Sequence, residues 1–217
     1  MSPILVTTPA AENYLKTIYA HTEWQVELIT ASALATQLSV APSSVTEMVK
    51  KLATAGLITH VPYGPLSLTD AGRLRATAVV RRHRLIETWL VREMGYDWDQ
   101  VHDEAEILEH AISDRLLEAI NARLDYPERD PHGDPIPGAD GTVARAPAIL
   151  LADAAPKHSG TVLRISDRNP AILRELAADG VGPGTVLTVV EPLVVRLPSG
   201  QSRKLPSPTA ESIWVTA

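Results

Sequence analysis

The stretch from Asp97 to Arg115 constrains this chain of 217 residues more than any other, because it combines a helical pattern with side chains that bind metals. Asp97 or Asp99 can cap a helix, and acidic residues crowd its first turns, where the helix dipole favours them. At about 3.6 residues per turn, the ligands on one strip of this helix are His102, Glu106, Glu109 and His110. Carboxylates that share a helix face repel one another. A divalent cation such as Mn, Fe, Co, Ni or Zn, which binds imidazole and carboxylate, is therefore the expected partner.

A second pair of ligands lies upstream. His83 and Glu87 are four residues apart, so they share one face of a predicted helix. We expect them to close around one metal ion together with His102. Each pair alone is also compatible with a solvated helix surface, but two helices would rarely present matched ligands by chance. A second site would begin with the remaining ligands, Glu106, Glu109 and His110.

The composition excludes several classes of protein. The chain has no cysteine, so disulfides, Fe–S clusters and thiolate zinc sites are ruled out. The N-terminus has no signal-peptide pattern, and no apolar run reaches the roughly 18 residues of a membrane span. We expect a cytoplasmic protein that does not contact a membrane.

The net charge of −6 is unevenly distributed. Residues 1–84 hold 8 Lys and Arg against 5 Asp and Glu, whereas residues 85–147 hold 5 against 15. The remaining residues, 148–217, hold 7 against 6. This asymmetry suggests that residues 1–84 bind an anion and residues 85–147 bind a cation.

The first third of the chain has the element order of a winged helix-turn-helix DNA-binding domain. Predicted helices over 9–23, capped by Thr8, over 31–38, capped by Thr30, and over 42–54 precede two strands, 57–61 and 66–69, joined by a turn at 62–65. In that fold the third helix enters the major groove and the hairpin touches the DNA backbone. A winged helix used for protein–protein contact is the alternative. The expected DNA contacts are Ala41, Pro42, Ser43, Ser44, Thr46 and Lys50.

The rest of the chain predicts two further domains. A helix over 70–94 and a helix over 114–124, capped by Ser113, surround the metal strip. The apolar stripe of the second helix needs cover, which a symmetric dimer would provide. Short β-like runs after residue 143 suggest a small barrel of SH3-like size. The fold is therefore expected to be mainly α with a small β part, divided into a winged helix (1–72), a helical dimerisation and metal-binding domain (73–142) and an SH3-like domain (143–217).

The turn-rich segment 126–147 carries three further polar residues of interest. Asp130, His132 and Asp134 alternate with proline and glycine. A metal site is conceivable there, but local hydrogen bonding in turns explains these residues better. We therefore expect an ordered loop that passes into a linker.

Four stretches together resemble the DtxR/MntR family of metal-activated transcriptional repressors, over nearly the whole chain. They are Tyr14–Tyr19, Arg82–Glu87, Val101–His110 and Asp130–Gly138. The resemblance implies an N-terminal winged helix, a helical dimerisation and metal-binding domain, and a C-terminal SH3-like domain related to FeoA. It also implies that metal binding orders a homodimer for an operator upstream of metal-transport genes.

The resemblance also implies the ligands. One site would hold His83, Glu87 and His102, and the other Glu106, Glu109 and His110 with Asn13 from the first helix. In iron-dependent members a cysteine stands at the position of Glu106 and a methionine at that of Asn13, whereas manganese-dependent members have Glu and usually Asp. Glu106 thus resembles the manganese (MntR-like) branch, and carboxylate in place of sulfur favours the harder Mn²⁺. Asn13 departs from the usual Asp, although its amide oxygen can still ligate. Lys16 stands where some manganese members have Glu, which disfavours a tight binuclear cluster.

The SH3-like domain lends two ligands to the first site in iron-type members. Arg168 and Ala171 stand at those positions here and cannot serve. Asp167 is the possible substitute.

These features predict a Mn²⁺-activated, homodimeric repressor of metal-homeostasis genes that binds double-stranded operator DNA. Metal would connect the first helix, through Asn13, to the helices that carry the other ligands. The conformational population of the dimer would then shift toward the one in which the two recognition helices have the spacing that DNA requires. Fe²⁺ is the rival cofactor, and other divalent metals can substitute in vitro. A regulator that answers an organic ligand is a second alternative, although we expect no such ligand. A metal-dependent hydrolase is a third, but no extra base or oxyanion donor accompanies the strip, so we do not expect an enzyme.

Overall fold

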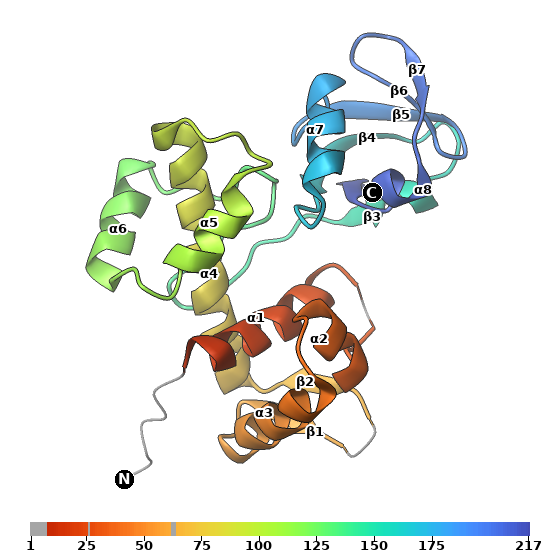
Figure 1. Cartoon of the computed structure of the whole chain (residues 1–217). Coiled ribbons are helices and arrows are strands. Elements are labelled where there is room, and N and C mark those ends of the chain that lie inside the picture. Colours follow the sequence, from red (N-terminus) through yellow and green to blue (C-terminus); the bar gives the residue numbers. More distant parts are fainter. Residues whose placement is uncertain (1–7, 26, 62–63) are drawn as a thin grey trace. The chain divides into compact units, whose positions relative to one another are not determined.

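The chain divides into two compact units, each described by itself (Figure 1). The computed structural model describes residues 8–25, 27–61 and 64–217. One unit runs up to Arg82 and includes Pro137–Thr142, and the other contains His83–Ile136 and Val143–Ala217. The division falls within one continuous helix, α4 (Asp70–Met94). None of the described helices is both long and apolar enough to cross a membrane.

The N-terminal unit begins with three helices and a hairpin. These are α1 (Pro9–Glu23), α2 (Ala31–Gln37), α3 (Pro42–Thr54), β1 (Ile58–His60) and β2 (Leu66–Leu68). Thr8 and Thr30 cap α1 and α2 as predicted, since their hydroxyls accept the amides of Ala11 and Ala33. The strands pair antiparallel, and Ile29 adds a bridge to Leu66. The predicted turn of the hairpin includes residues 62 and 63, which lie outside the described residues.

A close backbone approach fixes the start of α4 against the hairpin. The hydroxyl of Thr69 accepts the amide of Gly72 and donates to the carbonyl of Gly56. Gly72 lies so near the carbonyl of Leu57 that a Cβ atom there would overlap it. Only glycine fits at this point of the N-terminal unit.

Replacing Gly72 with alanine is therefore expected to destabilise the N-terminal unit by about 1–3 kcal/mol, a typical cost of overpacking. Thermal unfolding followed by circular dichroism measures the effect, and the midpoint should fall by several degrees. Gly182→Ala is the matched control, because a Cβ at Gly182 meets no atom within 4 Å. Equal midpoints for the two variants would contradict the prediction.

The C-terminal unit starts with the second half of α4 and two short helices, α5 (Val101–Leu108) and α6 (Asp114–Arg123). The single helix predicted over Asp97–Arg115 is therefore wrong at both ends. Ser113 caps α6 as predicted, and an N-cap takes extended dihedral angles, here φ −78° and ψ 150°, which a continuous helix cannot contain.

The apolar stripe of α6 is covered within its own chain. Leu117, Ile120 and Leu124 are buried in one cluster with Leu85 of α4. The expectation that this stripe needs a partner molecule is wrong for these three residues. Leu116 remains 53% exposed, and Ile107 of α5 is 69% exposed.

The chain then forms a sheet of six strands in the order β3-β8-β4-β5-β6-β7, in which all neighbours pair antiparallel. The strands are β3 (Ala148–Leu150), β4 (Ser159–Ile165), β5 (Val186–Glu191), β6 (Val194–Arg196), β7 (Ser202–Lys204) and β8 (Ile213–Thr216). Three short helices accompany them: the 3-10 helix η1 (Leu151–Asp153), α7 (Pro170–Ala178) and α8 (Ser207–Ala210). Leu173 and Leu176 of α7 pack into the core of this sheet. The expected mainly α fold with a small β part is confirmed.

Candidate metal centre

Helix α4 supplies the first two ligand-type side chains. His83 and Glu87 lie one turn apart and are 7% and 1% exposed. The Nε2 atom of His83 is 3.1 Å from Oε1 of Glu87. A buried carboxylate needs compensation by a positive charge or by hydrogen bonds, so the surroundings of Glu87 define the site.

Helix α5 brings a second histidine to the same carboxylate. His102 Nδ1 lies 3.8 Å from Glu87 Oε1, and the rings of His102 and His83 have centroids 5.0 Å apart. One turn later, Glu106 Oε1 is 3.6 Å from His102 Nε2. The predicted set of His83, Glu87 and His102 is thus brought together, although its role as a ligand set stays a prediction.

Glu109 and His110 lie just beyond α5. Glu109 is the C-cap residue of that helix and is completely buried. Its two carboxylate oxygens face different histidines, with Oε2 at 2.6 Å from His83 Nδ1 and Oε1 at 3.4 Å from His110 Nε2. Glu106, Glu109 and His83 also offer ligand atoms within 4.8 Å of one another. The two predicted sites therefore adjoin at His83.

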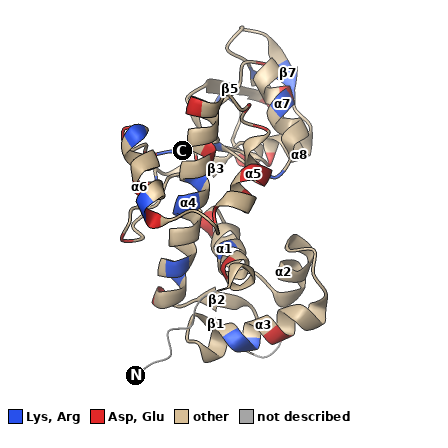
Figure 2. Ribbon diagram, turned by 60° about the vertical axis from the view of Figure 1, so that its left-hand side comes forward, with Lys and Arg blue, Asp and Glu red and all other residues tan. Residues whose placement is uncertain are grey.

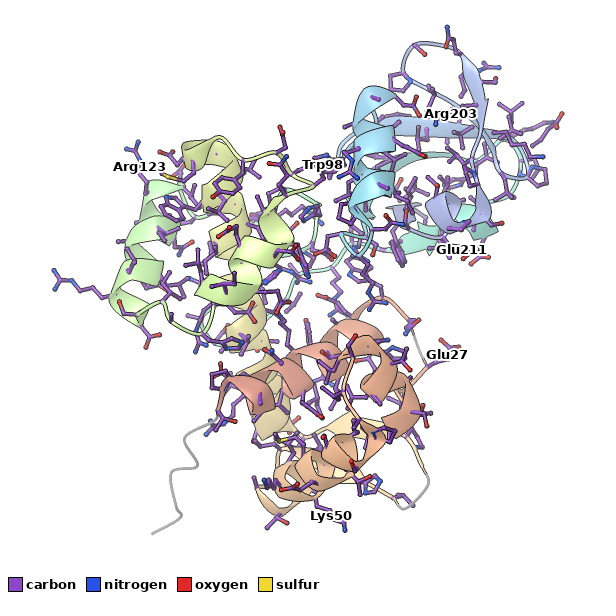
Figure 3. All side chains as sticks on the ribbon, in the orientation of Figure 1. Glu27, Lys50, Trp98, Arg123, Arg203 and Glu211 are labelled. Carbon is purple, nitrogen blue, oxygen red and sulfur yellow. The ribbon has the colours of Figure 1, made fainter. Side chains whose placement is uncertain are left out.

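The end of β4 and the loop after α6 contribute further groups. Asp167 Oδ2 is 2.9 Å from His102 Nδ1, so this carboxylate stands beside the first cluster, as the resemblance allowed. His132 Nδ1 lies 3.7 Å from Glu87 Oε2, and its other nitrogen donates to the carbonyl of Trp98 over 2.8 Å. Figure 3 labels Trp98, whose ring stacks on that of His132 with centroids 5.9 Å apart.

The turn interpretation of the 130–134 segment is only part of its role. Asp130 Oδ1 accepts the amides of His132 and Asp134, which is the local hydrogen bonding that was expected. All three residues are nevertheless buried, and Asp130, His132 and Glu87 form a third cluster of ligand atoms. The sequence analysis considered a metal site at His132 but preferred local hydrogen bonding in a turn, and so did not place His132 beside Glu87. Two signals pointed to it: its spacing from Asp130 and Asp134, and its place in the Asp130–Gly138 stretch of the family resemblance.

Three buried polar atoms in these clusters make no hydrogen bond to any described residue: Glu87 Oε1, His102 Nδ1 and His132 Nδ1. The first two lie close to possible partners but without the alignment that a hydrogen bond needs. Such atoms are rare in folded proteins and require an explanation. Ligand-type nitrogen and oxygen atoms that converge without a hydrogen bond fit the site of a cation that would displace the imidazole protons, and imidazole and carboxylate groups suit a divalent transition metal.

Electrostatics couple these groups strongly. Burial opposes ionisation of Glu87, but His83, His102 and His132 outweigh it and hold its pKa well below the usual value. Burial likewise opposes charging of His102, yet Asp167 and Glu87 raise its pKa to about 11. The pKa of His132 is raised to about 10, mainly by Glu87 against the effect of burial. Without a metal, both histidines therefore carry the positive charge that these carboxylates require.

Two carboxylates near the centre shift in opposite directions. Burial, together with the charges of Asp134 and Glu87, raises the pKa of Asp130 to about 8, although His132 and Arg84 act against this. Burial also disfavours the charged form of Asp167, but contact with His102 lowers its pKa well below the ordinary value. Asp167 is thus ready to ligate at neutral pH.

The remaining predicted residues lie in the N-terminal unit. Asn13 is a half-buried residue of α1, and its role as a ligand stays a prediction. On α3, the exposed Lys51 and Glu47 form an ion pair of 2.7 Å, and Figure 2 shows both signs of charge on this helix. Lys50, labelled in Figure 3, is exposed. The other predicted DNA contacts are also exposed: Ala41, Pro42, Ser43, Ser44 and Thr46.

A DNA-binding type of N-terminal unit, followed by helices whose histidines and glutamates converge, defines a class of metal-responsive regulators. Three family models match this chain. An iron dependent repressor N-terminal DNA binding domain covers residues 6–66, and the metal binding and dimerisation domain of the same repressors covers 69–138. A FeoA domain covers 149–217. The chain belongs to the DtxR/IdeR/MntR family of metal-dependent transcriptional repressors, which confirms the resemblance.

Individual relatives agree. The iron-dependent repressor IdeR of Mycobacterium leprae is 30% identical over 232 residues, which cover 99% of both proteins. The diphtheria toxin repressor of Corynebacterium diphtheriae is 36% identical over 149 residues, 66% of each protein. A solved manganese-dependent transcriptional repressor in complex with manganese is 46% identical, with a TM-score of 0.90 over 95% of this chain and 99% of that one. ScaR with bound Zn²⁺ is 32% identical, with a TM-score of 0.81 over 94% and 98%.

Proposed function

We propose that this repressor is activated by Mn²⁺, acts as a homodimer on operator DNA in the cytoplasm, and controls genes of metal homeostasis. The observation that carries the choice of metal is the donor set around Glu87, which contains imidazole and carboxylate groups and, in a chain without cysteine, no thiolate. Mn²⁺ prefers such oxygen and nitrogen ligands to the softer sulfur of thiolates and thioethers. The manganese-dependent structure at 46% identity supports the same choice. Fe²⁺ remains the rival, since the full-length curated relative is named iron-dependent.

Two groups of side chains would hold the metal. His83, Glu87, His102 and Asp167 would form one site, with His132 beside Glu87. Glu106 and Glu109 would begin the other, where His83 and His110 flank Glu109. A bound cation would supply the positive charge that the histidine protons supply in its absence. The carboxylates then keep their positions while the imidazoles turn from cations into neutral ligands.

Two observations bear on the proposed dimer: the family match of the helical domain and the apolar residues exposed on α5 and α6. The matching model for residues 69–138 is described as a metal binding and dimerisation domain. Within that range, Ile107 and Leu116 are more than half exposed on α5 and α6. Exposed apolar residues support an interface only where they form a contiguous patch, so the family description carries this proposal and the two residues are the first positions to test. The family consists of DNA-binding repressors, and we propose no catalytic activity.

Glu106→Ala and His110→Ala are each expected to abolish Mn²⁺-dependent DNA binding, because each removes a ligand of the proposed second site. The measurement is a gel shift with a duplex selected from a random pool by the Mn²⁺-loaded wild-type protein. Asp103→Ala is the control, since Asp103 is an exposed carboxylate on the same helix and should leave the shift unchanged. Full retention of the shift in both ligand variants would refute the assignment.

The choice of metal is tested with the same duplex by titrating Mn²⁺, Fe²⁺ under anaerobic conditions, and Zn²⁺. We expect Mn²⁺ to activate at concentrations that a cell can supply. A stronger response to Fe²⁺ would favour iron-dependent repression. A shift that needs no metal would support the organic-ligand alternative.

A further inference from the structure

The loop after α6 carries two buried aspartates that face two buried arginines. Asp130 and Asp134 are 8% and 4% exposed, and both Arg84 of α4 and Arg164 of β4 are 7% exposed. Arg164 Nε lies 2.9 Å from Asp134 Oδ1, and Arg84 Nη2 lies 3.6 Å from the same oxygen. Arg84 also approaches Asp130 Oδ2 at 3.5 Å and donates to the carbonyl of Pro135 over 2.7 Å. Asp134 therefore links the metal-bearing helix to the sheet.

Stability alone does not explain such a network. These four ionisable groups have lost their water, and apolar residues of similar volume often stabilise a protein as well or better. A buried ionic network does impose one arrangement on the segments that carry it, because each charge must meet its partner. The guanidinium of Arg164 also lies over the ring of Trp214, with its Cζ 4.4 Å from the ring centre. Its position is thus determined by both neighbours.

The arrangement fixed by this network ends at the metal centre. Arg164 lies three residues before Asp167, whose carboxylate is 2.9 Å from His102. Between them, the amide of Ile165 donates to the carbonyl of His132 over 2.9 Å. The loop lies so close to β4 that a Cβ on Gly133 would overlap the carbonyl of Leu163. The same contact therefore places the end of β4 that leads to Asp167, whereas His132 has anchors of its own in Asp130 Oδ1 and the carbonyl of Trp98.

We propose that Arg164 is a positioning residue for the metal centre. Through its ion pair with Asp134 it holds the end of β4 against the loop. Asp167 is therefore already positioned at the metal site, and metal binding need not spend free energy on ordering it. This inference rests on the proposed function of the Glu87 centre. Groups that orient metal ligands typically change metal affinity by about 10-fold to 100-fold when removed.

The test is a double-mutant cycle on Mn²⁺ affinity, measured by isothermal titration calorimetry on the full chain. Arg164→Met and Asp167→Asn should each weaken Mn²⁺ binding by about tenfold or more. The combined variant should bind no more weakly than Asp167→Asn alone, because Arg164 acts through Asp167. In the metal-free Arg164→Met protein, the amides of Ile165 and Ser166 should exchange with solvent faster than in the wild type. Losses that add in the combined variant, or unchanged exchange, would overturn the proposal.

Two further variants separate positioning from a misplaced charge. Arg164→Met with Asp134→Asn removes one charge of each sign, and it should bind Mn²⁺ as weakly as Arg164→Met. Recovery of wild-type affinity in this neutral pair would overturn the proposal, since an uncompensated aspartate would then explain the loss. Arg203→Met is the matched control: it removes an arginine of β7, labelled in Figure 3, that pairs with Asp179 and Glu175 away from the loop, and affinity should not change.

The proposed function and this inference fail in different ways. If the wild-type protein itself binds no Mn²⁺, the proposed metal centre is wrong. If Glu87→Gln abolishes binding but Asp167→Asn and Arg164→Met do not weaken it, the centre stands and the positioning role of Arg164 is wrong.

Discussion

Glu87→Gln is expected to lower the affinity for Mn²⁺ by more than about 100-fold, beyond the range seen when a residue that only orients a ligand is lost. Glu87 is 1% exposed, and its two oxygens face three histidines: His83 and His102 at Oε1, and His132 at Oε2. Glutamine has nearly the same shape, but it loses the negative charge and places an NH₂ group where a lone pair is needed. Calorimetry measures the affinity, and the gel shift should disappear with it.

Asp103 is a carboxylate that lies outside the clusters, and it provides the matched control. Asp103→Asn makes the same chemical change at an exposed position of α5, and we expect wild-type affinity. Thermal unfolding of the metal-free Glu87→Gln protein shows whether it still folds, and added Mn²⁺ should no longer raise its midpoint. If Mn²⁺ stabilised the variant as much as the wild type, Glu87 would not be a ligand.

Local signals were the most reliable part of the sequence analysis. Thr8, Thr30 and Ser113 were predicted as helix caps, and all three hydroxyls accept an amide in the first turn of their helix. A cap depends on residues two or three positions away, so the sequence itself contains the required information. The i, i+4 spacing of His83 and Glu87 is local in the same sense.

The two main errors have a different origin. The helix predicted from Asp97 to Arg115 was too long, although the predicted cap at Ser113 already marked the start of a separate helix. No glycine or proline marks its end after Leu108, where the carboxylate of Glu109 meets His83 of α4. His132 was assigned to a turn because Asp130 does make the expected local hydrogen bonds. Its approach to Glu87 joins residues 45 positions apart, and spacing in a single sequence does not show such a contact. Only the family resemblance carried information of that range, and it also offered Asp167.

Mn²⁺ binding is expected to release protons and to weaken as the pH falls. In the metal-free protein the pKa of His102 is raised to about 11 and that of His132 to about 10, so both rings are protonated at neutral pH. A metal binds only the neutral imidazole, so each histidine that ligates must first lose its proton. The apparent affinity should therefore fall by about tenfold for each released proton when the pH falls by one unit. The dependence should weaken as the pH approaches about 10, where half of the His132 rings have lost their proton without metal.

Calorimetry at one pH in buffers of different ionisation enthalpy counts the protons, because each released proton adds the heat of buffer protonation. We expect at least one proton per Mn²⁺ near neutral pH, and one fewer in His102→Gln. His60→Gln is the matched control, since His60 is exposed on β1 and its removal should leave the count unchanged. Heats that do not depend on the buffer would show that the histidines are already neutral before binding. In that case the carboxylates around Glu87 would have to be compensated in the metal-free protein by something other than imidazolium.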